Sequence, residues 1–229
     1  MIPMTDNVNS TTLAVVKQEK VPVEETFGKI DIPQLESKSC CTNCISSLDN
    51  LDKKISLPLQ TYTPNLGIEI IFLIFAKLFN TITVIIYLIL ILFYSIFIAE
   101  NFKIFVIVLI HVLVGVFITV IIKKIIGRER PLLTVKRYFY KVRTNEMMNS
   151  MPSGDCLQSA NFALMIILYF DKQNYYKFFS VLFIPMSMIG RVFYCCHYWF
   201  DCFIGAFIGI FISYGCFLFI NKFNIINKL

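Results

Sequence analysis

The sequence is poor in charge, glycine and tryptophan. Of its 229 residues, 16% are Asp, Glu, Lys or Arg, nine are Gly and one is Trp. A soluble domain carries about 25% charged residues, so this composition excludes an ordinary soluble fold, and it also excludes collagen-like, coiled-coil and low-complexity chains. The chain is instead rich in apolar residues: 57% are hydrophobic, 23 are Phe, and the mean hydropathy is +0.69. These values predict a membrane protein.

The net charge is unevenly distributed along the chain. Residues 1–60 carry six Lys and eight acidic residues, whereas residues 61–229 carry fifteen Lys or Arg and seven acidic residues. The basic excess therefore falls in the few polar loops of the apolar part, where it predicts bound anions, either lipid headgroups or a phosphorylated substrate. A nucleic-acid partner is not expected, because basic residues are not interleaved with aromatic ones outside the apolar part.

Seven of the eight cysteines fall into two groups. In or beside apolar segments, where cysteine behaves as a small hydrophobic residue, lie Cys156, Cys195, Cys202 and Cys216. Cys40, Cys41 and Cys44 form a cluster without a fourth Cys or a His close enough in sequence to complete a zinc site. Reversible acylation near a membrane and plain reduced thiols are the alternatives for this cluster.

Residues 1–60 differ in kind from the rest. They mix Pro, Ser, Thr, Asn and both charge signs without a helical or strand period, and such a segment buries too little apolar surface to offset its ordering entropy. We therefore predict a disordered polar tail over residues 1–60 and a membrane-embedded domain over residues 61–229. No cleavable signal peptide is visible, so targeting is expected to come from a membrane span, with the endoplasmic reticulum or another endomembrane as the location.

Apolar runs in the second part predict membrane-spanning helices, which need roughly 20 residues to cross the hydrocarbon. Five such runs are Thr81–Ala99, Ile104–Ile122, Ser153–Phe170, Tyr176–Val192 and Tyr198–Ile220. A further run, Leu66–Phe79, reaches only about 21 Å as a helix and carries Glu69, Lys77 and Asn80 within one arc. It is either a sixth span with a polar stripe facing the bundle or a helix lying in the interface. The expected fold is all-α: an integral membrane bundle of six helices.

The longest polar connection of the membrane part covers residues 123–151 and holds eight Lys or Arg. Connections of that length within compact folds are usually functional. If the helices cross alternately, the third helix ends, the fourth begins, the fifth ends and the sixth begins at the same membrane face. We expect the chemistry to gather there.

Three short strings fall at that face. The first is Lys123-x6-Arg130-Pro131. Seven residues are two helical turns, so both cations share one face of a helix that Pro131 ends, and together they can flank one anion. Lys124 and Arg128 are interpreted as membrane-flanking residues that extend their charged ends to the interface.

The second string is Pro152-Ser153-Gly154-Asp155 at the start of the fourth helix. A helix N-terminus offers unpaired backbone N–H groups and the positive end of its dipole to a phosphate oxygen, and Gly154 allows close approach of the backbone. The alternative is that Ser153 is an ordinary N-cap.

The third string is Arg191-x5-His197-x3-Asp201. His197 and Asp201 are four residues apart on a helix and so share a face, where the carboxylate keeps one ring nitrogen protonated and the other free to attack phosphorus. Arg191 is rotated about 240° from His197 in a continuous helix, which predicts a break between the fifth and sixth helices. The other histidine, His111, is interpreted as a packed polar group, about 18 Å along its helix from Lys123.

In this order the three strings resemble the signature of the type 2 phosphatidic acid phosphatase superfamily: Lys-x6-Arg-Pro, Pro-Ser-Gly-His and Ser-Arg-x5-His-x3-Asp. The resemblance extends over residues 60–220 and implies the helical core that the family shares with haloperoxidases. It implies that His197 becomes phosphorylated and that Asp201 orients it. It implies phosphate binding by Lys123, Arg130, Ser153, Gly154 and Arg191.

The sequence departs from the family signature at two positions. Gly190 stands where the family has Ser, which predicts a lost hydrogen bond to phosphate. Asp155 stands where the family has the His that protonates the leaving oxygen. A carboxylate beside cations stays ionised and donates a proton poorly, whereas a departing phosphate monoester is a weak base that needs little protonation. We therefore predict a preference for lipid diphosphates over phosphatidic acid, as in the polyisoprenoid and presqualene diphosphate phosphatases, which this chain resembles most.

The sequence thus predicts a metal-independent membrane phosphatase acting on lipid phosphates or diphosphates. No metal and no cofactor are expected; the partners are a membrane lipid substrate and the bilayer, and the sequence predicts no oligomeric state. Two alternatives remain open. One is a family member that binds phospholipid headgroups without catalysis, because Asp155 replaces the usual His, and the other is a phosphotransferase that passes phosphorus from His197 to an alcohol.

Overall fold

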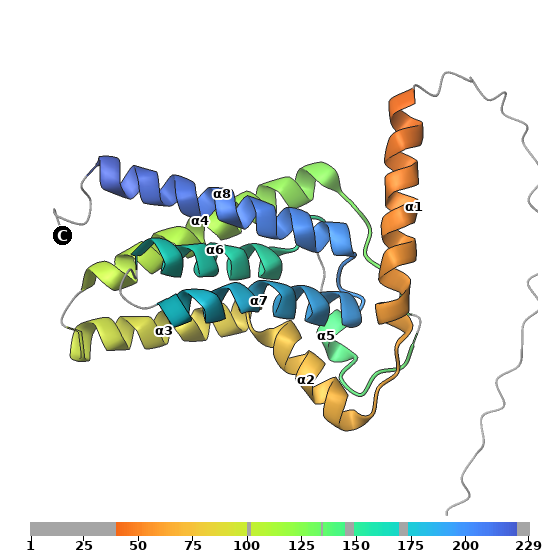
Figure 1. Cartoon of the computed structure of the whole chain (residues 1–229), viewed down its shortest axis with the longest axis horizontal. Helices are drawn as coiled ribbons and strands as arrows, with labels where there is room; N and C mark the ends of the chain where they lie inside the picture. Colours follow the sequence, from red (N-terminus) through yellow and green to blue (C-terminus); the bar gives the residue numbers. More distant parts are fainter. Residues whose placement is uncertain (1–39, 100–101, 134, 145–148, 170–173, 224–229) are drawn as a thin grey trace, which may run out of the picture. The chain divides into compact units, whose positions relative to one another are not determined.

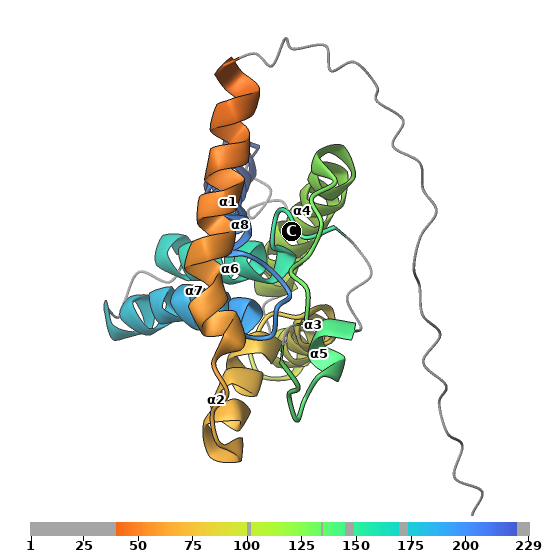
Figure 2. The ribbon, with the colours of Figure 1, turned by 90° about the vertical axis from the view of Figure 1, so that its right-hand side faces the viewer.

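The structure, a computed structural model, describes residues 40–99, 102–133, 135–144, 149–169 and 174–223. Within these ranges all regular structure is helical, with no strand. The helices are α1 Cys40–Thr61, α2 Leu66–Lys77, α3 Thr81–Phe97, α4 Phe102–Ile126, α5 Lys141–Thr144, α6 Gly154–Tyr169, α7 Asn174–Phe193 and α8 Trp199–Lys222. The long apolar helices α3, α4, α6, α7 and α8 lie side by side as a bundle, and α1 crosses one end of it (Figures 1 and 2).

The six predicted helices correspond to α2, α3, α4, α6, α7 and α8. By length and composition α4, α8 and Tyr175–Phe193 of α7 are each able to cross a membrane, and α2 with α3 forms a fourth candidate as one span bent by 64°. The remaining predicted spans, α3 and α6, are shorter, at 17 and 16 residues. The chain is therefore an all-helical membrane protein.

The bend between α2 and α3 explains the ambiguous run Leu66–Phe79. Asn80 caps α3 by accepting a hydrogen bond from the Thr83 N–H at 2.8 Å, and such a cap starts a new helix. Glu69 of α2 faces the protein, where its Oε1 accepts a hydrogen bond from the Phe139 N–H at 3.1 Å. Glu69 of the predicted polar stripe thus has a partner within the fold.

Helix α1 occupies a segment that was predicted to be part of a disordered tail. It packs on α7 and α8, and the compact unit to which it belongs begins at Ser39. The apolar pattern did not reveal this helix because the residues that it buries are polar: Asp52, Ser56 and Gln60. Residues 1–39 and the side chains of Cys40, Cys41 and Cys44 lie outside the described part, so their predictions stay predictions.

Helices α6 and α8 pack against each other at backbone distance. A Cβ on Gly205 would lie 2.4 Å from Ser153 O, and a Cβ on Gly209 would lie 2.3 Å from Leu157 O. Glycines four residues apart allow two membrane helices to approach at backbone distance. This contact fixes the start of α6 against the start of α8. The buried cysteines Cys156, Cys202 and Cys216 pack in the adjoining apolar clusters, as predicted.

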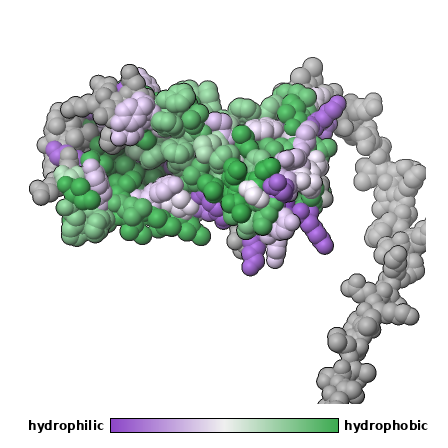
Figure 3. Space-filling view, turned by 60° about the horizontal axis from the view of Figure 1, so that its bottom comes forward, coloured by the Kyte–Doolittle hydropathy of each residue, from purple (hydrophilic) through white to green (hydrophobic). Residues whose placement is uncertain are grey.

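The surface agrees with a membrane environment. Large apolar side chains such as Ile82 (67% exposed) and Phe207 (62% exposed) point outward from the bundle, whereas soluble monomers rarely expose extensive apolar patches. In Figure 3 hydrophobic residues cover much of the bundle, and hydrophilic residues gather toward its right-hand end, where α1 lies.

Candidate active site

Four helix ends meet at the end of the bundle that α1 crosses: those where α4 and α7 end and those where α6 and α8 begin (Figure 1). This confirms the alternation predicted from the sequence. The Ser153 N–H donates a hydrogen bond to Asp201 O at 3.0 Å, and the Cys196 N–H donates to Arg191 O at 3.0 Å. The first bond brings the second and third strings of the sequence together, and the second bond lies within the third string.

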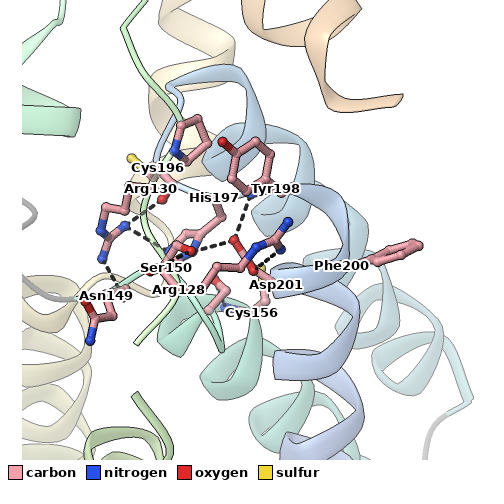
Figure 4. A network of polar contacts seen from close by, with 12 residues as sticks. Arg128, Arg130, Asn149, Ser150, Cys156, Cys196, His197, Tyr198, Phe200 and Asp201 are labelled. Carbon is pink, nitrogen blue, oxygen red and sulfur yellow. Dashed lines mark hydrogen bonds and ion pairs between the residues drawn. The ribbon is translucent and has the colours of Figure 1, made fainter. Parts of the chain in front are cut away.

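His197 lies in the predicted break between α7 and α8, two residues before α8 begins. Its side chain is almost fully buried, with 1% exposed. Nε2 lies 3.3 Å from Arg130 Nη1, and Nδ1 lies 3.8 Å from Asp201 Oδ2 (Figure 4). The prediction that His197 and Asp201 lie four apart on one helix is wrong, yet the two side chains still face each other. They do so because Asp201 is in the first turn of α8, where its Oδ2 accepts the Tyr198 N–H at 2.9 Å.

Lys123 and Arg130 also converge by a different route from the predicted one. Helix α4 ends at Ile126 because Gly127 has a left-handed φ of 64°, a conformation typical of the residue that ends a helix. Arg130 therefore lies beyond the helix instead of sharing a helical face with Lys123. Both side chains nevertheless reach the same carbonyl: Lys123 Nζ lies 2.6 Å and Arg130 Nη2 lies 3.5 Å from Asn149 O.

Ser153 and Gly154 occupy the N-terminus of α6 as predicted. Ser153 is buried, and its Oγ accepts a hydrogen bond from the Cys156 N–H at 3.4 Å, which is the geometry of an N-cap. Gly154 is the first residue of α6 and lines the cavity described below. Ser153 is thus an N-cap, and phosphate binding by this helix end stays a prediction.

Asp155 forms an ion pair with Arg191, with 3.0 Å between Oδ2 and Nη1. The two side chains come from α6 and from the last turn of α7. Arg191 is 2% exposed, so the carboxylate lies close to a buried cation. The residue at the position of the family's acid His is therefore engaged with a residue predicted to bind phosphate.

Gly190, the other departure from the family signature, lies under α2. A Cβ at this position would lie 2.4 Å from Ala76 N and 2.7 Å from Phe75 C, both backbone atoms. Backbone atoms of a packed helix cannot move aside as the end of a flexible side chain can. Close packing against α2 therefore explains the glycine at position 190. The prediction of a lost hydrogen bond to phosphate did not include this packing.

Arg128 is the residue that the sequence interpretation missed. Its Nη1 lies 2.6 Å from Asp201 Oδ1 and 2.8 Å from Asp52 Oδ2, and its Nη2 lies 2.7 Å from Asp49 Oδ1. The guanidinium also lies 4.4 Å from the centre of the Tyr198 ring. Burial lowers the pKa of Arg128, but the surrounding carboxylates outweigh it, so the pKa lies above its ordinary value. Arg128 is not a membrane-flanking residue reaching for the interface.

Arg137 is a second buried cation of the long connection. Its guanidinium lies 3.6 Å from the centre of the Phe193 ring and donates to the carbonyls of Gln60 at 2.7 Å and Tyr62 at 3.0 Å. Burial lowers the pKa of Arg137. This arginine ties the connection to the end of α1, so part of the basic excess serves the fold.

A cavity of about 580 Å³ opens beside His197. Its polar end holds Lys123, Arg130, Asp155, Arg191 and His197. Its other walls come mostly from apolar residues of α3 and α4, among them Ile82, Ile85, Leu88, Val112 and Val116. One cavity is thus lined by three cations at this end, by a fourth, Lys77 of α2, and by apolar side chains.

Two further predictions concern metal ligands and His111. Across the part of the chain that the structure describes, no three His, Cys, Asp or Glu side chains gather closely enough to hold a metal ion. His111 is buried in α4, where its Nδ1 lies 2.8 Å from Ile107 O and its ring packs edge-on against Tyr169. His111 is therefore a packed polar group, as predicted.

The fold and the three strings define a helical membrane protein with a cluster of cations at one end of its bundle. The sequence profile of the PAP2 superfamily matches residues 104–225, so the chain belongs to this superfamily. A search of curated proteins found no match.

Two solved structures are similar in fold. One is the first transmembrane PAP2 type phosphatidylglycerolphosphate phosphatase from Bacillus subtilis, with a TM-score of 0.63, 16% identity, and coverage of 77% of this chain and 87% of that one. The other is Aquifex aeolicus LpxE, with a TM-score of 0.54, 21% identity, and coverage of 72% of this chain and 94% of that one. Both support a PAP2 fold that includes helices before residue 104.

Proposed function

We propose that the chain is a membrane phosphatase that hydrolyses a lipid phosphate or diphosphate through a phosphohistidine on His197. The observation that carries this proposal is the position of the ring. Nε2 lies 3.3 Å from Arg130 Nη1 at the polar end of the cavity, while Nδ1 faces Asp201 at 3.8 Å. A carboxylate beside one ring nitrogen favours the tautomer in which the other nitrogen is a free nucleophile.

The reaction needs two displacements at phosphorus. In the first, Nε2 of His197 attacks, the bond from phosphorus to the leaving oxygen breaks, and that oxygen keeps the electron pair. In the second, water attacks the phosphohistidine, the P–N bond breaks, and inorganic phosphate leaves. Lys123, Arg130 and Arg191 stabilise the charge on the equatorial oxygens, and the N-terminus of α6, at Gly154, adds backbone N–H donors.

The proposed substrate class follows from the walls of the cavity. Three cations bind the phosphate group, and the apolar surface of α3 and α4 suits a hydrocarbon chain. PAP2 membership and the likeness to a phosphatidylglycerolphosphate phosphatase support a lipid substrate. Within this class we propose a preference for isoprenoid-type diphosphates, because the ion pair between Asp155 and Arg191 favours an ionised carboxylate that donates no proton to a poor leaving group.

The same ion pair also favours a second candidate function. A carboxylate 3.0 Å from Arg191 competes with phosphate for this cation, as expected in a family member that binds headgroups without turning them over. Catalysis is the better proposal, because His197 and Asp201 are both buried and face each other. A headgroup site has no need of such a pair.

The test measures phosphate release by the purified full chain in detergent–lipid micelles. The substrates are phosphatidic acid, phosphatidylglycerol phosphate and an isoprenoid diphosphate, with and without an added alcohol as phosphoryl acceptor. Wild type is expected to release phosphate in EDTA, to be inhibited by vanadate, and to carry an acid-labile phosphate on His197 during turnover. The variant His197→Ala should lose all turnover, whereas the control His111→Asn should keep it.

Each other outcome either overturns one part of the proposal or selects one of the two alternative functions. Full activity in His197→Ala would overturn the mechanism, and loss of activity in EDTA with recovery in Mg²⁺ would overturn metal independence. Binding of lipid phosphates without turnover would select the headgroup-binding function. Transfer to the alcohol in preference to water would select the phosphotransferase.

A further inference from the structure

Helix α1 lies outside residues 104–225, the part that matches the PAP2 profile, but it contacts the loop that carries His197. Its buried face is polar. Asp52 and Ser56 are fully buried and Gln60 is 5% exposed, and residues four apart lie on one face of a helix. Buried polar groups cost free energy unless they are hydrogen-bonded, so their partners indicate what this face is for.

The partners are backbone groups next to His197. The Phe200 N–H donates to Asp52 Oδ1 at 3.0 Å, and the Trp199 N–H donates to Ser56 Oγ at 3.1 Å. Gln60 Nε2 donates to His197 O at 3.4 Å. The first N–H groups of a helix have no partner within it, and here two of them, at the start of α8, bind side chains from a different helix.

Arg128 extends the contact from α1 to Asp201. One guanidinium bonds Asp49 and Asp52 of α1 and also Asp201 Oδ1 at 2.6 Å. The other oxygen of Asp201 faces His197 Nδ1 (Figure 4). The orientation of Asp201 therefore depends on Arg128 as well as on the Tyr198 N–H, and the position of Arg128 depends on α1.

We propose that α1 is a positioning element of the active site, in which Asp52 acts on His197 through Arg128 and Asp201 while Ser56 and Gln60 hold the backbone of the same loop. The inference rests on the proposed phosphatase function. None of these α1 residues lines the cavity, so Asp52 is a positioning residue and not a catalytic one. Its effect falls on the rate of the chemical step, because misplacement of a reacting group by about 1 Å costs up to roughly 10²-fold in rate.

The central variant is Asp52→Asn, which keeps an acceptor oxygen for the Phe200 N–H but removes the charge that binds Arg128. We expect kcat to fall about 10- to 100-fold with KM unchanged, since the groups that bind substrate are untouched. Ser56→Ala should lower kcat less. The matched control is Lys54→Gln, on the exposed side of the same helix, which should leave both constants at wild-type values.

A double-variant cycle separates positioning from general stabilisation. If Asp52 acts through Arg128, Asp52→Asn combined with Arg128→Gln has the same kcat as Arg128→Gln alone, because residues of one network are not additive. Independent losses that multiply would overturn the proposal. So would an Asp52→Asn protein whose thermal midpoint falls while kcat per folded molecule, counted by size-exclusion chromatography, stays at the wild-type value.

The phosphatase function is judged first and separately. Wild-type turnover that His197→Ala abolishes establishes it, and any failure in the α1 variants then counts against α1 alone. If wild type releases no phosphate from any of the lipids, the proposed function and the positioning role are both overturned, because positioning requires a reaction.

Discussion

Two arginines, two residues apart in the loop after α4, point to opposite sides of His197. Arg130 lines the cavity, and its Nη1 lies 2.6 Å from Cys196 O and 3.3 Å from His197 Nε2. Arg128 points to the supporting side, toward Asp201 (Figure 4), and it also pairs with Asp49 and Asp52 of α1. Neighbouring cations of the same loop thus have different surroundings.

The number of carboxylates around each arginine decides whether its positive charge supports the fold or is available to bind a phosphate. The charge of Arg128 is neutralised by three carboxylates of the protein, so Arg128 has little attraction left for a phosphate. Arg130 lies at the cavity wall with Lys123 and Arg191, where it faces a phosphate bound in the cavity. We therefore expect removal of Arg128 to cost structure and activity together, and removal of Arg130 to cost activity far more than stability.

The largest effect is expected for Arg128→Ala. This change leaves Asp52 and Asp201, both fully buried, without their ion-pair partner. Breaking a buried ion pair by removing one member costs roughly 3–5 kcal/mol of folding free energy. The contact that orients Asp201 toward His197 is lost with it. Thermal and denaturant unfolding in detergent should both show the loss. Arg128→Lys keeps the charge without the forked geometry of the guanidinium, so its stability and turnover should lie between those of wild type and Arg128→Ala. An Arg128→Ala protein as stable as wild type would contradict the comparison of the two arginines.

The next largest effect is expected for Arg130→Ala. A preorganised donor to the charge that develops in the transition state is worth about 10²–10³ in kcat, so turnover should fall by that factor while the thermal midpoint stays close to wild type. The control is Lys124→Ala, an exposed cation at the end of α4, which should change neither quantity. A large drop in the midpoint for Arg130→Ala would show that both arginines are structural.

The sequence predicts the apolar helices well. It predicts the cavity side of the site better than the supporting side, which Arg128 and α1 form. Tyr176–Val192 was expected and Asn174–Phe193 is observed, because a long apolar run in a membrane protein has few alternatives to a helix. Five residues at the polar end of the cavity were identified from the three short strings: Lys123, Arg130, Asp155, Arg191 and His197.

The sequence did not predict helix α1 or the role of Arg128, and the reason is physical. The buried face of α1 is made of Asp52, Ser56 and Gln60, so no apolar period marks it. The partners of Arg128 lie 73 and 79 residues away in sequence, at Asp201 and Asp49. From the sequence alone, a charge in a loop beside a membrane is equally consistent with a side chain at the membrane interface and with a side chain paired inside the protein. Only the tertiary fold distinguishes these two roles.

A smaller effect is expected for Gly190→Ser, which restores the residue usual in the family. The added Cβ would lie 2.4 Å from Ala76 N, and overpacking of this kind costs typically about 1–3 kcal/mol. We expect a lower thermal midpoint and no gain in turnover. Gly215→Ser is the matched control, because a Cβ on this glycine of α8 would meet no atom within 4 Å. A rise in turnover at unchanged stability would show that the missing hydroxyl limits the enzyme.

The smallest effect is expected for Asp155→Asn on a diphosphate substrate. A positioned general acid contributes roughly 10²–10⁴ in rate where the leaving group is poor, as for the alkoxide that leaves a monophosphate ester. The ion pair between Asp155 and Arg191 at 3.0 Å favours the carboxylate, which has no proton to donate, and the phosphate monoester that leaves a diphosphate is a weak base. Asparagine should therefore change isoprenoid diphosphate hydrolysis little, and the release of Arg191 from its carboxylate partner should lower KM.

The informative partner of that variant is Asp155→His, which supplies the acid that the family usually has at this position. It should raise hydrolysis of phosphatidic acid selectively and leave the diphosphate rate near that of wild type. Phosphate release from the two lipids by the three proteins, measured side by side, gives the comparison. An equal collapse of both activities in Asp155→Asn would mean that Asp155 is a protonated, working acid in spite of its contact with Arg191, and the preference for diphosphates would then need another cause.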